Sequence, residues 1–166
     1  MDIARVVGAD TRNDGYCSGN GYMVTWALGH LVSLATPDTY GYTKTAAEDL
    51  PMLPDPFRLV SRQMRTDRGM VTDIAASKQL KVIESVFNRC DSIIVATDAG
   101  REGELIFRWI YDFLGCTKPF RRLWISSLTD EAIRKGLEEL KDGSEYDSLY
   151  AAADSRAKAD WLVGMN

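Results

Sequence analysis

The sequence has few of the residues that mark metal-stapled or secreted proteins. Its 166 residues include three cysteines (Cys17, Cys90 and Cys116) and one histidine, and no two cysteines form a C-x-x-C pair. A zinc site is therefore not expected, and the scattered cysteines favour free buried thiols in a reducing compartment. No apolar run approaches the roughly 18 residues of a membrane span, which excludes a transmembrane helix. The start, MDIARVVGAD, lacks the regions of a signal peptide, so we expect a cytoplasmic protein.

An excess of basic charge is also missing. Lys and Arg total 20 against 24 Asp and Glu, a formal net charge of -4. Dedicated nucleic-acid-binding domains are usually basic, so this balance argues against stand-alone DNA binding and leaves room for a local patch. The run Arg58, Arg62, Arg65 and Arg68 is either such a patch or a solvated basic edge.

The chain is long enough for one sizeable hydrophobic core, and its patterns change along its length. The first part predicts a helix end over 2–8 capped by Gly8, a β-hairpin and its continuation over 15–35, an irregular stretch over 36–56 and a strand over 57–62. The second part predicts a helix from about 73 to 89, a buried strand over 91–98, a helix ending at Gly115, a strand over 120–126, a helix capped by Thr129 and a final helix over 145–163. This order predicts an α/β fold with a mainly parallel central sheet flanked by helices, plus a β excursion near residues 15–62.

The most informative segment is IIVATDAGREGELIFRWI, where an acidic loop joins a buried strand to a helix. Asp98 follows the carboxyl end of the strand, which is where open α/β sheets place their sites. Glu102 lies close enough across the turn to share a hard cation with Asp98, and Arg101 suits a phosphate or a carboxylate. The alternative is that Glu102 and Glu104 only complement the positive end of the helix dipole.

The segment TDAGREGE resembles the acidic signature of the Toprim domain, which type IA topoisomerases, primases and some nucleases share. VTWALGHL, LPMLP, RLWISSLT and ADWLVGMN are similar, in the same order, to segments of the prokaryotic topoisomerase III group of type IA DNA topoisomerases. A tryptophan that members often carry before LPMLP is absent near Thr45.

The resemblance implies a Rossmann-like Toprim fold and ATP-independent strand passage. In that chemistry a tyrosine cuts one single-stranded DNA phosphodiester through a 5′-phosphotyrosyl bond, and religation follows. Asp98 and Glu102 are then expected to bind Mg²⁺ (or Mn²⁺), with Glu102 and Arg101 as catalytic residues. The second aspartate of the D-x-D-x-E motif is replaced by Gly100.

The resemblance also implies DNA contacts by the last helix, from Trp161, Arg156 and Lys158. Trp161 is equally expected in the core, and Arg156 can form a surface ion pair with Asp160. His30, in the GHL segment, is expected to be a structural, hydrogen-bonded histidine. Tyr40 and Tyr42 have no expected role, and no nucleophilic tyrosine is expected in this chain.

The family's first strand, with its E-K-P motif, precedes the helix that residues 2–8 predict, so this strand is expected to be missing. Residues 1–145 are then a clipped Toprim domain with an insertion at 15–62, and residues 146–166 begin a helical domain. We expect this fragment to be inactive alone and to expose a sheet seam where a second copy can pair to form a dimer. The alternatives are the Toprim domain of a primase or nuclease and a catalysis-free nucleic-acid-binding module. A phosphate-binding module of the response-regulator receiver type is not favoured. That fold needs an acidic pair near its first strand and a lysine after a later strand, and the sequence shows no such arrangement.

Overall fold

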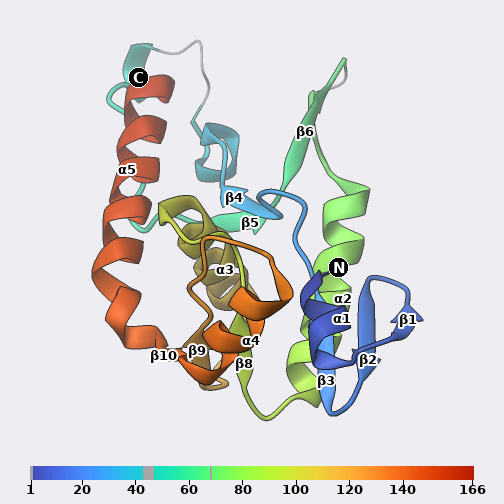
Figure 1. Cartoon of the computed structure of the whole chain (residues 1–166). Coiled ribbons are helices and arrows are strands. Elements are labelled where there is room, and N and C mark those ends of the chain that lie inside the picture. Colours follow the sequence, from blue (N-terminus) through green and yellow to red (C-terminus); the bar gives the residue numbers. More distant parts are fainter. Residues whose placement is uncertain (1, 43–46, 68) are drawn as a thin grey trace.

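The computed structural model describes residues 2–42, 47–67 and 69–166 (Figure 1). Thr45 and Arg68 lie outside the described residues. The α-helices are α1 (Asp2–Val7), α2 (Ile74–Arg89), α3 (Arg101–Phe113), α4 (Asp130–Glu138) and α5 (Asp147–Met165). The strands are β1 (Thr11–Asn13), β2 (Tyr16–Gly19), β3 (Tyr22–Thr25), β4 (Val32–Leu34), β5 (Leu59–Ser61), β6 (Gln63–Thr66), β7 (Gly69–Thr72), β8 (Ile93–Val95), β9 (Phe120–Arg122) and β10 (Lys141–Asp142). Short 3-10 helices cover Pro37–Tyr40, Ala47–Asp49 and Gly143–Tyr146.

The central sheet has the order β10-β9-β8. β8 and β9 are parallel, with Ile93 opposite Phe120 and Val95 opposite Arg122, and β10 is antiparallel to β9. The predicted α/β fold is confirmed, but the central sheet is mixed and not mainly parallel, because β10 joins it antiparallel to β9. The strand–helix–strand unit makes the one parallel pairing in the described residues. The strands are shorter than the sequence predicts: the strands expected over 91–98 and 120–126 contain three residues each. Residues 91–92 precede β8, and residues 96–98 and 123–126 lie in the loops that follow the two strands.

The main core lies where α2, α3 and α5 meet β8. Periodic apolar residues of the amphipathic helices α2 and α3 form most of this core, and Val95 of β8 contributes from the sheet. The buried members include Leu80, Ile83 and Phe87 of α2 and Leu105, Phe107, Trp109 and Ile110 of α3. Asp73 caps α2 by accepting hydrogen bonds from the backbone amides of Ala75 and Ala76, and Thr129 caps α4, as predicted.

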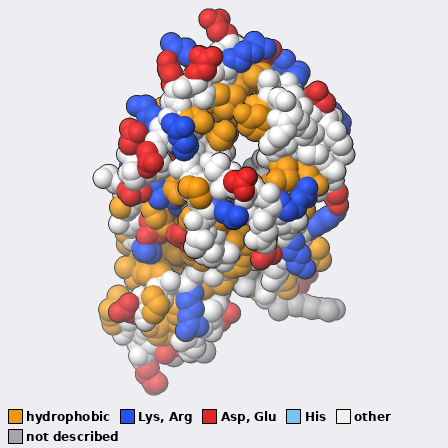
Figure 2. All heavy atoms as spheres, turned by 90° about the horizontal axis from the view of Figure 1, so that it is seen from below, with side chains coloured by type: hydrophobic (Ala, Val, Ile, Leu, Met, Phe, Trp, Pro, Cys, Tyr) orange, Lys and Arg blue, Asp and Glu red, His pale blue; other side chains and the backbone are white. Residues whose placement is uncertain are grey.

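β8 ends the strand order of the central sheet, so one of its edges pairs with no other strand in the described part of the chain. β4 and β5 form a separate two-stranded sheet that packs on α3. Figure 2 shows the molecule from below, where hydrophobic side chains border part of an opening in the surface. The open edge of β8 offers unpaired backbone groups to another strand.

The N-terminal half is built from antiparallel pairs. β1, β2 and β3 form a meander whose β2–β3 hairpin was predicted, and β4 pairs with β5. The β6–β7 hairpin was not predicted, and it stands away from the body at the upper right of Figure 1. Its alternation is weak because the residues of β7 are all exposed, so no buried face marks it in the sequence.

The last helix, α5, packs along α3. The Trp109 indole donates a 3.0 Å hydrogen bond to Asp154, and the Tyr150 hydroxyl donates one of the same length to Asp112. These bonds fix the register of the two helices, and so they place the α5 side chains beside the start of α3. No helix in the described ranges combines the length and apolar character that crossing a membrane requires.

Candidate functional site

The acidic loop makes a tight turn between β8 and α3. Gly103 lies so close to the turn that an added Cβ would sit 2.0 Å from the Asp98 carbonyl oxygen. Only glycine fits there, and the Thr97 hydroxyl closes the turn by donating a 2.7 Å hydrogen bond to the Gly103 carbonyl. The close approach brings Asp98 over the first turn of α3.

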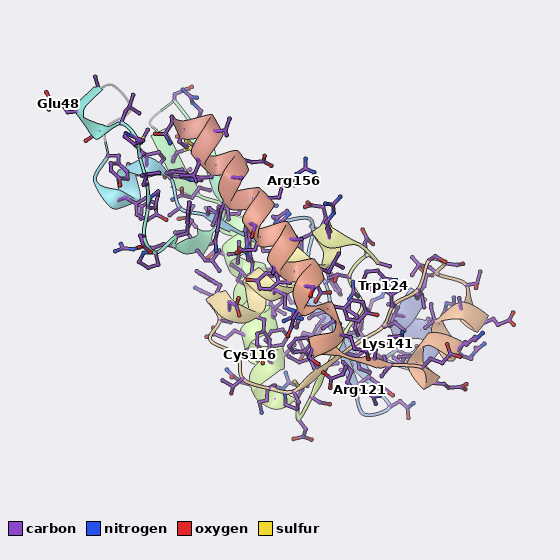
Figure 3. All side chains as sticks on the ribbon, turned by 90° about the vertical axis from the view of Figure 1, so that its left-hand side faces the viewer. Glu48, Cys116, Arg121, Trp124, Lys141 and Arg156 are labelled. Carbon is purple, nitrogen blue, oxygen red and sulfur yellow. The ribbon has the colours of Figure 1, made fainter. Side chains whose placement is uncertain are left out.

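The loop borders a hollow of about 500 Å³ that is lined by residues of the acidic loop, the start of α3 and α5. The charged side chains that line it are Asp98, Arg101, Glu102, Arg156 and Asp160. Figure 3 shows Arg156 projecting from the middle of α5. The structure therefore brings four of the expected site residues, Asp98, Arg101, Glu102 and Arg156, around one hollow.

Gly100 lines the same hollow and begins α3 in an extended conformation, with φ of 174°. A Cβ added at this position would meet nothing within 4 Å. The missing second aspartate therefore leaves open space in the site. Within the described residues, no cluster of three or more His, Cys, Asp or Glu is arranged to hold a metal ion.

Glu104, the third carboxylate of the loop, does not belong to this hollow. Its side chain is fully buried and accepts hydrogen bonds from Arg108 at 2.9 Å and Arg122 at 3.0 Å. The expectation that Glu104 only complements the helix dipole is too simple, because its main partners are two guanidinium groups. Glu104 is thus the anchor of α3 in the protein interior.

Arg122 is the residue that the sequence did not reveal. It is fully buried at the end of β9 and donates hydrogen bonds to the carbonyl oxygens of Thr97 and Asp98, each at 2.7 Å. Burial lowers the pKa of its guanidinium, and the neighbouring Glu104 carboxylate opposes that shift. Arg122 therefore holds the backbone of the acidic loop from inside. The segment FRRLWIS contains two arginines, and its sequence does not distinguish the buried Arg122 from the exposed Arg121.

His30 also reaches the site. Its Nε2 atom lies 3.0 Å from the Glu102 Oε2 atom, and its ring meets the Trp109 ring edge-on at 5.6 Å between centroids. The expected hydrogen-bonded histidine is found, and its partner is a residue of the acidic loop.

The other DNA-binding candidates on α5 lie elsewhere. The Trp161 side chain is buried at 7% exposure, donates a 2.8 Å hydrogen bond to the Ala35 carbonyl and contacts the rings of Tyr40 and Phe57. Lys158 pairs with Asp154 at 2.5 Å. The expected surface pair between Arg156 and Asp160 is present at 3.6 Å. Trp161 therefore occupies the core position that was one of its two expected placements.

The basic run does not form one continuous patch in the described residues. The Arg62 guanidinium donates to Asp73 at 2.6 Å and to the carbonyl oxygens of Leu28 and His30. Arg58 lies over the Tyr40 ring at 5.8 Å. Arg65 is exposed on β6. Arg62 is thus a structural clamp on the loop that carries His30.

Comparison with known proteins gives one consistent result. A family model described as the Toprim domain matches residues 2–128. The chain is 49% identical, over 99% of its length, to DNA topoisomerase 3 of Shouchella clausii (strain KSM-K16) and of Bacillus anthracis. It is 46% identical, over the same share, to DNA topoisomerase 3 of Bacillus subtilis (strain 168). Each match covers 22% of the relative, so the chain spans about a fifth of the length of these curated relatives.

Proposed function

Because the chain belongs to the Toprim domain family, we propose that it is the metal-binding and DNA-contacting part of a type IA DNA topoisomerase. The observation that carries this proposal is the shared hollow, which is lined by the acidic residues Asp98 and Glu102 and by the basic residues Arg101 and Arg156. Carboxylates beside arginines suit a phosphodiester that is bound together with a hard cation. The similarity to topoisomerase 3 favours this reading over a primase or nuclease.

The donor set fits Mg²⁺, with Mn²⁺ as a substitute. Asp98 and Glu102 offer oxygen atoms at the rim of an open hollow, and Mg²⁺ is usually held by one or two carboxylates plus water and phosphate. When bound, the cation would neutralise charge on a DNA phosphate. The proposal includes neither zinc nor ATP.

The remaining residues of the hollow are proposed to act on the DNA strand. Arg101, at the first turn of α3, is placed to bind a phosphate oxygen, and Glu102 beside it shares the cation with Asp98. Arg156 adds a second phosphate contact from α5. Lys158 is proposed as a weaker contact, because its ammonium group is engaged by Asp154. Trp161 would support these contacts indirectly, by holding α5 through the Ala35 carbonyl.

The organisation of the whole protein is also a proposal. Residues 1–145 form the Toprim domain, and residues 146–166 begin a following helical domain. The strand passage activity requires a nucleophilic tyrosine outside this chain, so the 166 residues alone are inactive. The open edge of β8 is proposed to pair with a second copy when the chain is studied alone, and the protein is proposed to act in the cytoplasm.

Fluorescence anisotropy of a labelled single-stranded oligonucleotide tests the proposal. In Mg²⁺, the chain should bind the oligonucleotide more tightly than its Asp98→Asn variant, and the two should bind alike in EDTA. Asp91→Asn, at the opposite end of β8, is the matched control and should bind like the wild type in both conditions. Equal affinities of the wild type and Asp98→Asn in Mg²⁺ would contradict the proposal. Relaxation of supercoiled plasmid by the purified chain would contradict its inactivity.

A further inference from the structure

We propose that His30 is a positioning residue that orients the Glu102 carboxylate toward the cation. This inference rests on the proposed function, because it concerns the same metal site. Its main observation is the 3.0 Å contact between His30 Nε2 and Glu102 Oε2, which joins residues 72 positions apart in the sequence. The contact links the loop after β3 to the first turn of α3.

The chemistry of the two groups fixes the direction of the bond. An ionised carboxylate only accepts hydrogen bonds, so the shared hydrogen belongs to His30 Nε2. The bond engages one carboxylate oxygen and restricts rotation of the side chain around it. Carboxylates that bind metal ions are commonly held by such hydrogen bonds from neighbouring groups.

Glu102 needs this support more than Asp98 does. Its side chain is 77% exposed, and an exposed glutamate has several rotamers that a cation must order before it can bind. Asp98 is a shorter side chain whose own carbonyl is held by Arg122 at 2.7 Å. The hydrogen bond from His30 therefore orders the one flexible carboxylate of the pair in advance.

His30 is itself held in place from two sides. Its ring lies edge-on against Trp109, which is buried in the core. Its backbone carbonyl accepts a 3.1 Å hydrogen bond from Arg62, and Asp73 fixes that guanidinium at 2.6 Å. The loop that presents His30 is thus clamped to the start of α2, so its ring has a defined position from which to direct Glu102.

Binding of Mn²⁺ to the 166-residue chain, measured by isothermal titration calorimetry, tests the proposal with three variants. His30→Phe keeps an aromatic ring against Trp109 and removes the donor, and it should weaken Mn²⁺ binding by about tenfold. His30→Gln restores a donor at a similar reach and should recover most of that loss. Asp98→Asn should abolish binding, which tests the metal site independently of His30.

Nuclear magnetic resonance gives a second measurement that does not depend on metal. The chain contains one histidine, so the ring nitrogen signals belong to His30 without ambiguity. In the metal-free protein at a fixed pH, Glu102→Gln should shift these signals, because it changes the acceptor that His30 Nε2 contacts. Glu131→Gln, an exposed glutamate in the first turn of α4, is the control and should leave them unchanged.

The outcomes separate the role of His30 from the metal site itself. Weaker Mn²⁺ binding in His30→Phe with recovery in His30→Gln supports the positioning role. Wild-type affinity in His30→Phe, an equal loss in both folded His30 variants, or unshifted ring signals in Glu102→Gln would overturn it and leave the proposed metal site intact. Absence of Mn²⁺ binding in the wild type would overturn both.

Discussion

The Arg122 guanidinium and the Glu104 carboxylate form a 3.0 Å ion pair in which neither side chain is exposed to solvent. The pair connects the end of β9 to the first turn of α3, and Arg122 extends it to the carbonyl oxygens of Thr97 and Asp98. The backbone that presents the Asp98 carboxylate is therefore fixed by a buried charge network, while the carboxylate itself faces the hollow.

Glu104→Gln should lower the free energy of unfolding by about 3–5 kcal/mol, because Arg108 and Arg122 would lose their shared buried counter-ion. Urea denaturation measures this change. Glu102→Gln is the matched control on the same helix turn, and it should stay within about 1 kcal/mol of the wild type because Glu102 is exposed. Equal stabilities of the two variants would show that the buried network does not hold the loop.

Gly100→Asp should strengthen Mg²⁺ or Mn²⁺ binding by about tenfold, since a third carboxylate adds charge and a ligand to the site. The extended backbone at position 100 accepts any residue, and the space around an added Cβ is open. Calorimetric titration measures the change. Gly164→Asp adds the same charge near the end of α5, and it should leave the affinity unaltered. An unchanged affinity in Gly100→Asp would mean that the cation does not bind beside this position.

The stability of the protein should depend on Asp73 in acid. The Ala76 backbone amide and the Arg62 guanidinium hold the pKa of this carboxyl below its ordinary value of 3.8. A folded-state pKa below the unfolded one stabilises the protein above the unfolded pKa, and this stabilisation is lost as pH falls through the folded pKa. Thermal melting should therefore show Asp73→Asn below the wild type near pH 7, with the gap closing below about pH 4. A gap that stays constant down to about pH 2 would contradict this account.

Trp161→Ala should cost about 3–5 kcal/mol of unfolding free energy, because it removes a large buried side chain and the hydrogen bond to Ala35. Val163→Ala, at an 83% exposed position on the same helix, should change stability by no more than about 0.5 kcal/mol. Chemical denaturation followed by circular dichroism compares them. A Trp161→Ala variant with wild-type stability would contradict the core role of Trp161 and favour its alternative role as a DNA contact.

Arg156→Gln should weaken binding of a single-stranded oligonucleotide and reduce the slope of log affinity against log salt by about 0.7, the value for one phosphate contact on a single strand. Arg134→Gln is the matched control, because Arg134 also forms an i,i+4 ion pair, at 3.7 Å with Asp130, away from the hollow. Anisotropy titrations at several salt concentrations measure both slopes. Equal slopes for the two variants would exclude Arg156 as a phosphate contact.

Most of the fold could be predicted from local sequence patterns. The cap at Thr129, the glycine turns of the acidic loop and the apolar stripes of α2 and α3 are features of neighbouring residues, and sequence reasoning uses such features well. The α/β class and the position of Asp98 at a strand end follow from them. The β6–β7 hairpin was missed because its exposed strands have no buried face to produce an alternating pattern.

The contacts between residues far apart in the chain could not be predicted from the sequence. Nothing near Arg122 indicates that its guanidinium is buried against Glu104, 18 positions away, and the 72-residue separation hides the contact between His30 and Glu102. A buried arginine and an exposed one have the same local sequence signal, since only tertiary packing decides where the charge is compensated. The carboxylates of the site were therefore predictable, and the groups that hold them were not.

Thermal melting across a Mg²⁺ titration, with Asp98→Asn alongside, tests the central claim most directly. The claim is that the acidic loop of this chain binds a divalent cation through Asp98. Ligand at about ten times its dissociation constant should stabilise the wild type by about 1.4 kcal/mol, which raises the melting temperature by a few degrees. The variant should melt like the wild type in EDTA and show no shift in Mg²⁺. A wild type that does not respond to Mg²⁺, or an equal shift in Asp98→Asn, would contradict the account.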